Sequence, residues 1–155
     1  MNNLASLLQD QGQLEEAAPL YRRALAACER TLGAEHPHTL TSVNNLASLL
    51  KAQGQLEEAA PLFRRALAAR ERTLGAEHPD TLVSMYNLAS LLRKTGDLAQ
   101  AETLARRSLQ GYAARGLRSD VEDGVGQLGA ILRAQGKADE AAALRAAYGT
   151  RSGRQ

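Results

Sequence analysis

The chain has 155 residues, of which 44% are hydrophobic and only 3% aromatic, and its formal net charge is +2. A chain of this length fits one ordinary domain or a short array of repeats. Alanine and leucine are abundant and strand-forming residues are scarce, so the composition argues against a sheet and predicts an all-α protein.

A single cysteine, Cys28, is present, so no internal disulfide can form. This favours a reducing compartment, and we expect a cytoplasmic, intracellular protein. No stretch approaches the roughly 18 apolar residues that a membrane span needs, and the N-terminus has no basic leader. We therefore expect no membrane segment and no targeting signal.

The first unit is repeated almost unchanged in the second. Residues 2–42 and 44–84 match at 35 of 41 positions, and a looser third copy begins with YNLASLL at Tyr86. Self-similarity at a fixed period of this length is typical of a solenoid, in which each unit buries its apolar face against its neighbours.

Within residues 37–75, apolar side chains recur at helical spacing in two runs separated by Gly54. The first run predicts a helix whose apolar face carries Leu40, Val43, Leu46, Ala47 and Leu50. The second run predicts a helix whose inner side carries Leu56, Ala59, Phe63, Ala66, Leu67 and Leu74. Gly54 suits the left-handed conformation that ends a helix, and Pro37 suits the first position of one. Each unit is thus predicted to be a helical hairpin.

The predicted array occupies residues 1–148 as a single domain, followed by a disordered tail at 149–155. Its units are expected at about 1–33 (partial), 37–75, 79–115 and 117–148. The last unit is two residues shorter, and its first helix is weakened by Gly124, Gly126 and Gly129. We interpret it as a degenerate cap of the array.

The residue order resembles a known family. Large, small, large, Gly, large, Ala, aromatic and Ala is the tetratricopeptide pattern, and it is matched by Leu46, Ala47, Leu50, Gly54, Leu56, Ala59, Phe63 and Ala66. The period of 42 residues and the segments LGAEHPHTL and LGAEHPDTL resemble the kinesin light chain and nephrocystin type of repeat. The resemblance implies an α-solenoid, a right-handed superhelix of antiparallel helix hairpins.

The resemblance also implies a site, because the first helices of such hairpins line a concave groove that holds a peptide. Asn3, Asn45 and Asn87 match a groove asparagine, which Gln127 replaces in the fourth unit. The candidate peptide-binding residues are Asn3, Asn44, Asn45, Ser48, Lys51, Tyr86, Asn87, Ser90 and Arg93. An alternative remains open: these amides bridge neighbouring helices or solvate the face.

The carboxylate clamp of chaperone-binding arrays is not reproduced in this sequence. Its lysine and arginine positions are occupied by Asn44, Thr41, Val83 and Asn87. We therefore expect an internal peptide segment with some acidic character, and not an acidic C-terminal tail.

Few residues are arranged for catalysis or for metal binding. His36 and His78 are equivalent residues one period apart, so they cannot readily meet at one metal ion, and His36 and His38 form a weak pair at best. Phosphate-binding glycine loops are absent from the sequence. We expect no enzyme activity, no cofactor and no metal site.

Three functional hypotheses follow from the sequence. The first is a noncatalytic scaffold that binds a protein or peptide segment in the concave groove. The second is a structural module that forms a homodimer through its uncapped N-terminal end, where large apolar side chains would otherwise remain exposed to solvent. The third and weakest is an anion or nucleic-acid surface on the basic C-terminal third, where dense basic stripes with stacking aromatics are not found.

Overall fold

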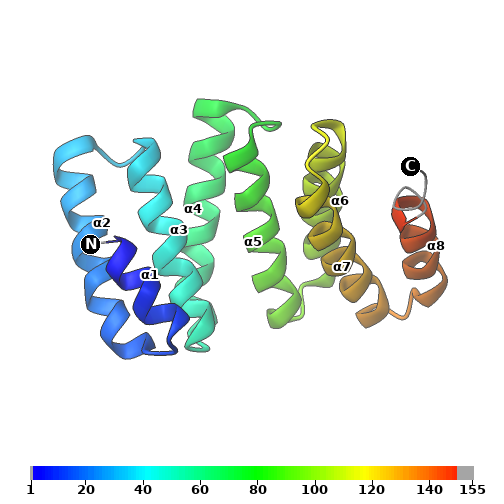
Figure 1. Cartoon of the computed structure of the whole chain (residues 1–155), viewed down its shortest axis with the longest axis horizontal. Helices are drawn as coiled ribbons and strands as arrows, with labels where there is room; N and C mark the ends of the chain where they lie inside the picture. The colour runs from blue at the N-terminus through cyan, green and yellow to red at the C-terminus, as the bar shows by residue number, and fades with distance from the viewer. Residues whose placement is uncertain (1, 150–155) are drawn as a thin grey trace. The chain divides into compact units, whose positions relative to one another are not determined.

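The computed structural model describes residues 2–149, and these residues form helices and turns without any strand (Figure 1). Eight helices follow one another: α1 (Asn2–Asp10), α2 (Leu14–Leu32), α3 (Pro37–Ala52), α4 (Leu56–Leu74), α5 (Pro79–Thr95), α6 (Leu98–Ala114), α7 (Arg118–Ala134) and α8 (Ala138–Gly149). The prediction of an all-α chain built from helix pairs is confirmed. The expected tail lies, from residue 150 on, outside the described residues.

The chain divides into two compact units, residues 1–84 and 85–155, and the division falls inside α5. We name them the N-terminal unit and the C-terminal unit. The N-terminal unit contains α1 to α4 and the start of α5. The C-terminal unit contains the rest of α5 and α6 to α8.

In the N-terminal unit, α2 packs against both α1 and α3, and α3 packs against α4. The second helices of the two copies, α2 and α4, bury a shared set of positions, because residues at helical spacing face the neighbouring helix. Tyr21 and Phe63, one period apart, are both buried. The rest of the core is mainly aliphatic, with Ala5, Ala17, Leu40, Val43, Leu46, Leu49, Leu50, Ala59 and Ala66.

The turn inside each hairpin depends on a glycine. Gly54 follows α3 with a φ of 79°, in the left-handed region that L side chains adopt at a cost. This conformation lets the Gln55 amide donate to the Leu50 carbonyl at 2.9 Å, which satisfies a carbonyl at the end of α3. The same geometry recurs at Gly12, with a φ of 78°. The predicted role of these glycines is confirmed.

The connection between hairpins explains the His-Pro segment of the repeat. His36 is the N-cap of α3, and its Nδ1 accepts a hydrogen bond from the His38 amide at 3.2 Å. Pro37 then occupies the first helical position, where an amide hydrogen would have had no partner. His78 repeats the bond, because its Nδ1 accepts from the Asp80 amide at 3.2 Å. Each imidazole thus caps the first helix of the next hairpin.

In the C-terminal unit, α7 packs against α6 and against α8. Its core contains Leu88, Leu92, Ala105, Leu109, Leu128, Ile131 and Leu132. The last helix contributes little to this core, since Ala141 is its one buried residue among those described.

Candidate functional site

The candidate residues of the N-terminal unit lie mainly on α3. Asn45 and Ser48 are one helical turn apart and remain partly exposed, whereas Leu46, Ala47 and Leu49 between and beside them are buried. Asn3, on α1, is exposed. An amide and a hydroxyl on one open helix face can donate to and accept from a peptide backbone.

Asn44 lies elsewhere. Its side chain is only 6% exposed, and its Nδ2 donates to Ser84 Oγ, at the start of α5, at 3.2 Å. No described residue pairs with its buried Oδ1. Asn44 therefore fits the alternative in which a repeat amide bridges neighbouring first helices.

A buried arginine shares this contact. Arg70, on α4, is 4% exposed, and its Nη1 donates to the Asp80 carbonyl and to Ser84 Oγ, both at 3.0 Å. Its Nη2 donates to Oγ1 of Thr41, an exposed residue of α3, at 3.2 Å. Burial lowers the pKa of Arg70, and the nearby Asp80 charge opposes this shift. The guanidinium accordingly stays charged with neutral hydrogen-bond partners.

Sequence reasoning missed Arg70, although a signal was present. The first two copies differ at six aligned pairs: Gln9/Lys51, Asp10/Ala52, Tyr21/Phe63, Cys28/Arg70, His38/Asp80 and Thr41/Val83. Arg70, Asp80 and Thr41 come from three of these pairs, and the three residues meet in the structure. Three of the six differences between the near-identical repeats therefore cluster in space.

Lys51 turns toward its own hairpin. Its Nζ lies 5.9 Å from the centroid of the Phe63 ring, which is the range of a cation–π interaction. The side chain is half-buried. Its ammonium thus stands over α4 instead of extending fully toward the face that carries Asn45.

The candidate residues of the C-terminal unit lie on α5. Tyr86, Asn87 and Ser90 are partly exposed, and Arg93 is exposed. Burial raises the pKa of Tyr86, as does the charge of Asp123, whereas Arg93 lowers it. Asn87 and Ser90 reproduce the spacing of Asn45 and Ser48, so each unit carries one amide and one hydroxyl on an open face.

Gln127 has a different place from the groove asparagine that it was predicted to replace. Its side chain is 7% exposed, and its Nε2 donates to the Tyr86 carbonyl at 2.8 Å. No described residue pairs with its Oε1. Gln127 thus ties α7 to the backbone of α5, and its side chain, one methylene longer than that of asparagine, gives it the reach to do so.

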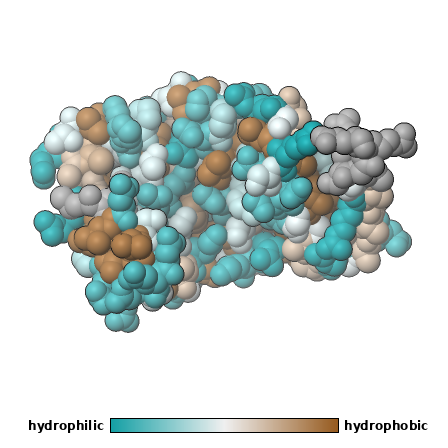
Figure 2. All heavy atoms as spheres, in the orientation of Figure 1, coloured by the Kyte–Doolittle hydropathy of each residue, from teal (hydrophilic) through white to brown (hydrophobic). Residues whose placement is uncertain are grey.

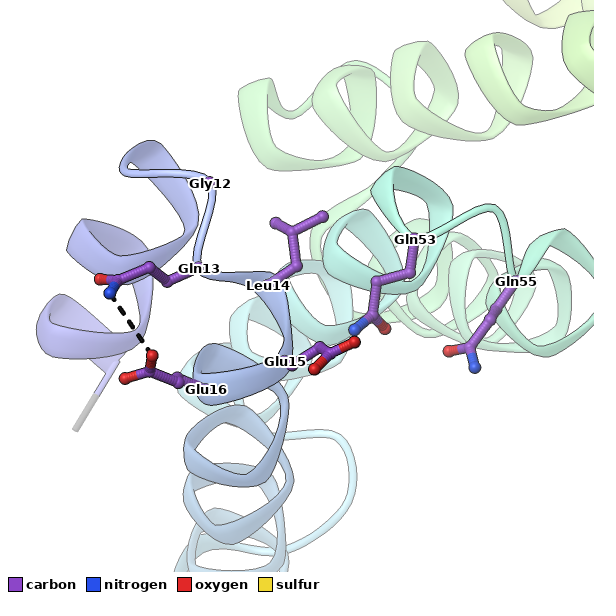
Figure 3. A pocket seen from close by; sticks show the side chains of 7 residues that line it. All are labelled: Gly12, Gln13, Leu14, Glu15, Glu16, Gln53 and Gln55. Carbon is purple, nitrogen blue, oxygen red and sulfur yellow. Dashed lines mark hydrogen bonds between the residues drawn. The ribbon is translucent and has the colours of Figure 1, made fainter.

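A cavity of the N-terminal unit lies at the hairpin turns. It has a volume of about 600 Å³, and Figure 3 shows the side chains around it: Gly12, Gln13, Leu14, Glu15, Glu16, Gln53 and Gln55. Gln13 Nε2 donates to Glu16 Oε1 at 3.4 Å (Figure 3). The lining is mostly amides and carboxylates, and none of the candidate peptide-binding residues belongs to it.

Among residues 2–149, no three or more His, Cys, Asp or Glu side chains come together in a group that could hold a metal ion. The rings of His36 and His38 lie 5.3 Å apart, but Nδ1 of His36 is already engaged in the helix cap. In the same part of the chain, no helix combines the length and apolar character that a membrane crossing requires.

The sequence profile described as tetratricopeptide repeat matches residues 1–72 and again residues 39–114. The chain belongs to the tetratricopeptide repeat family. The predicted α-solenoid fold is confirmed by this match and by the helix pairs. The family is in general made of noncatalytic protein-interaction scaffolds.

Solved structures carry the comparison further. This tetratricopeptide array is similar to a structure described as a kinesin light chain with nearly identical TPR-like repeats, from Podosopora anserina. The two are 31% identical with a TM-score of 0.89, over 99% of this chain and 75% of that one. A structure of a substituted form of the same protein matches with the same identity and TM-score, over 74% of its length.

BtubC (BKLC) from P. vanneervenii shares the fold at 24% identity, with a TM-score of 0.85. That match covers 98% of this chain and 63% of BtubC. No curated protein matches the sequence. The predicted kinesin light chain-like repeat type is confirmed by the structural matches.

Proposed function

We propose that this tetratricopeptide array is a noncatalytic scaffold that binds an extended segment of a partner protein on the first helices of its repeats. The observation that carries the proposal is the partial exposure of Asn45 and Ser48 on α3, and of Asn87 and Ser90 on α5. Most other residues of α3 and α5 that face the neighbouring helices are buried, so partly exposed polar side chains at equivalent positions of two repeats support a ligand that contacts both repeats. An amide side chain suits the peptide backbone because it both donates and accepts.

Arg70 supports an acidic residue in the bound segment. Its guanidinium is buried, bonded to hydroxyls and a carbonyl, and reaches Thr41 on the exposed surface of α3. The charge of Asp80 offsets part of the cost of burying the Arg70 cation, and a carboxylate supplied by a partner would offset more of it. An acidic peptide would therefore gain more at this place than a neutral one.

The proposal is tested with peptides selected from a phage-displayed library of random sequences and measured by fluorescence anisotropy. The double variant Asn45→Ala, Asn87→Ala should weaken binding by roughly tenfold or more, because two hydrogen-bonded amides are lost. Helicity by circular dichroism should stay unchanged, since both side chains are partly exposed. Unchanged affinity in the double variant would reject the proposal.

Matched controls separate the site from general damage. Gln110→Ala removes an exposed amide from α6, a second helix of its hairpin, and should leave affinity unchanged. Arg70→Cys installs the residue that the previous repeat carries at the equivalent position, Cys28, and circular dichroism checks that the variant stays helical. This variant should lower affinity for an acidic peptide and not for the same peptide with its carboxylates changed to amides.

Self-association is a second candidate, and one observation favours it. Leu4 and Leu7 on α1 are each 53% exposed, whereas the equivalent Leu46 and Leu49 on α3 are 6% and 0% exposed. Figure 2 shows hydrophobic side chains gathered over α1. The positions of Leu4 and Leu7 are buried in the next repeat, at Leu46 and Leu49. A helix hairpin from a second copy of the chain could cover Leu4 and Leu7 in the same way.

The dimer is tested by light scattering over a range of concentrations. The unaltered chain should be a dimer, because burying each exposed leucine in the interface would stabilise the dimer by about 1.5–3 kcal/mol. The double variant Leu4→Gln, Leu7→Gln should be a monomer. Leu32→Gln, at the exposed end of α2, is the matched control and should still dimerise. A chain that is monomeric at high concentration would reject the dimer and leave the peptide site standing.

A further inference from the structure

Histidines cap the helices that follow two of the connections between hairpins. His36 lies at the end of the loop between α2 and α3, and His78 lies at the end of the loop between α4 and α5. In each case Nδ1 accepts a hydrogen bond from the amide of the residue two positions later, at 3.2 Å. The third connection is different, because Leu117, the N-cap of α7, forms no side-chain hydrogen bond to its helix.

This hydrogen bond requires a neutral imidazole. One ring nitrogen of a neutral histidine donates and the other accepts, so the ring proton of His36 must be on Nε2 when Nδ1 accepts. A second proton would occupy the lone pair of Nδ1, and two donors would then face each other. The charged ring would also lie at the N-terminus of α3, where the helix dipole disfavours a cation. Protonation of His36 thus removes the cap of α3.

The acids and arginines beside His36 are already paired with one another. Glu35, the preceding residue, pairs with Arg72 of α4. Glu29, on α2, pairs with Arg65 of α4 at 2.7 Å, and Arg65 also donates to a backbone carbonyl of the loop at 3.4 Å. Two acids and two arginines cancel in net charge, so an added proton on His36 makes this region net positive.

His38 adds a second imidazole to the same region. Its ring lies 5.3 Å from that of His36 and is exposed to solvent. Like charges at this distance disfavour each other, so a protonated His38 raises the cost of protonating His36. His38 also lies in the first turn of α3, where a positive charge is unfavourable.

The surroundings of His78 are acidic instead. Asp80 takes the place of His38 in the first turn of α5, and Glu77 precedes His78. Both carboxylates favour a charged imidazole and offset part of the loss of the cap. Arg70, on α4, opposes them in part, because it donates to the Asp80 carbonyl at 3.0 Å. Protonation should therefore cost less stability here than at the first connection.

We propose that the connection between α2 and α3 is a pH-sensitive joint, in which uptake of a proton by His36 releases the cap of α3 and destabilises the packing of α2 on α3. The two helices are in direct contact, so the N-terminus of α3 is part of that packing. An unfolded chain accepts the proton freely and the capped helix resists it, so the free energy of unfolding falls as the pH falls. Imidazoles change charge between about pH 5 and 8. The joint goes beyond the proposed binding function and does not depend on it.

Nuclear magnetic resonance of the full ¹⁵N-labelled chain tests the hydrogen bond directly and needs no variant. At pH 7.5, the imidazole nitrogen signals of His36 should show the ring proton on Nε2, because Nδ1 accepts from the His38 amide. A ring proton on Nδ1 of His36 at this pH would overturn the proposal.

Thermal unfolding at pH 7.5 and pH 5.5, followed by circular dichroism, tests the effect on stability. The chain has 3 histidines and 1 cysteine, so few other side chains change charge over this range. The Tm of the unaltered chain should be lower at pH 5.5 by roughly 2–4 °C, the shift expected when one helix cap is lost in a chain of this size. His36→Asn should remove at least half of this fall, because asparagine is a good N-cap and does not titrate.

Two matched variants separate His36 from the other histidines. His38→Asn removes the exposed ring and leaves the cap in place, so a fall in Tm should remain. His78→Asn should remove less of the fall than His36→Asn, because the acids beside His78 offset the lost bond. The proposal would be overturned by an equal fall in His36→Asn and the unaltered chain, by no fall in the unaltered chain, or by a fall that His38→Asn alone abolishes.

Discussion

At the scale of single residues, Glu102 pairs with two basic side chains. Its carboxylate accepts from Lys137 Nζ at 2.9 Å and from Arg106 Nη2 at 2.7 Å, which ties α6 to the start of α8. These bonds lower the pKa of Glu102 from 4.5 to about 2. They also engage two of the basic residues of the C-terminal third, which weakens the case for an anion-binding surface there.

The lowered pKa of Glu102 predicts a pH dependence. Because the folded pKa lies below the unfolded one, the stabilisation is fully present above pH 4.5 and is lost as the pH falls toward about 2. Glu102→Gln should lower the free energy of unfolding by about 1 kcal/mol at neutral pH. Chemical denaturation at neutral pH and near pH 3 should show this difference shrinking in acid.

A matched control for Glu102 is Glu122→Gln, on α7, where the carboxylate is exposed and has no ion pair among the described residues. Its effect on unfolding should be small at both pH values. If Glu102→Gln and Glu122→Gln behaved alike, the assigned role of the Glu102 contacts would be wrong.

Contacts of individual side chains are the feature that the sequence predicts least well. The pattern identified Asn44 and Asn45 together, but only the structure separates a buried bridge from a half-open side chain. Adjacent residues on a helix point about 100° apart, so a small rotation of α3 decides which one faces the next helix. Arg70 and Gln127 were missed as contacts for the same reason: their partners are far away in the sequence.

At the scale of helices, the sequence pattern alone predicted where each helix begins and ends. Gly54 and Pro37 mark the ends of the helices as predicted, because φ preferences and missing amide hydrogens act locally. The His-Pro segment was recognised from the resemblance, and its cap geometry explains it. His36 and His78 each hold an amide of the following turn. Elements governed by local geometry could therefore be predicted, and contacts between elements could not.

The first helix of the fourth unit offers a stability test. Gly126 on α7 is exposed, and a Cβ added there would meet nothing within 4 Å. Gly126→Ala should therefore raise the free energy of unfolding by roughly 0.5–1 kcal/mol, because alanine loses less backbone entropy in a helix. Thermal or chemical denaturation measures the change.

Gly124 on the same helix is the control for this prediction. A Cβ at Gly124 would lie 3.2 Å from Leu109 Cδ1, a tight contact with a buried side chain of α6. Gly124→Ala should gain less stability than Gly126→Ala, or lose some. Equal gains at both glycines would show that packing against α6 does not restrict this face of α7.

At the scale of the whole molecule, near-identical repeats have been adapted at few positions. Cys28, Arg70 and Tyr112, which are one period apart, place a thiol, a guanidinium and a phenol at the same repeat position, while the helix pairs around them are built alike. In a linear array, each repeat can change its polar contacts without changing the fold, because it touches only its neighbours. Ligand chemistry can therefore vary along the array one repeat at a time.

The central claim is that the open amides of the first helices bind the backbone of a partner segment. Side-chain amide signals in nuclear magnetic resonance spectra of the ¹⁵N-labelled chain report on it directly during titration with a selected peptide. The account predicts large shifts for Asn45 and Asn87, and little change for the exposed Gln110 of α6. Shifts confined to Gln13, Gln53 and Gln55 around the turn cavity, with Asn45 and Asn87 unmoved, would contradict it.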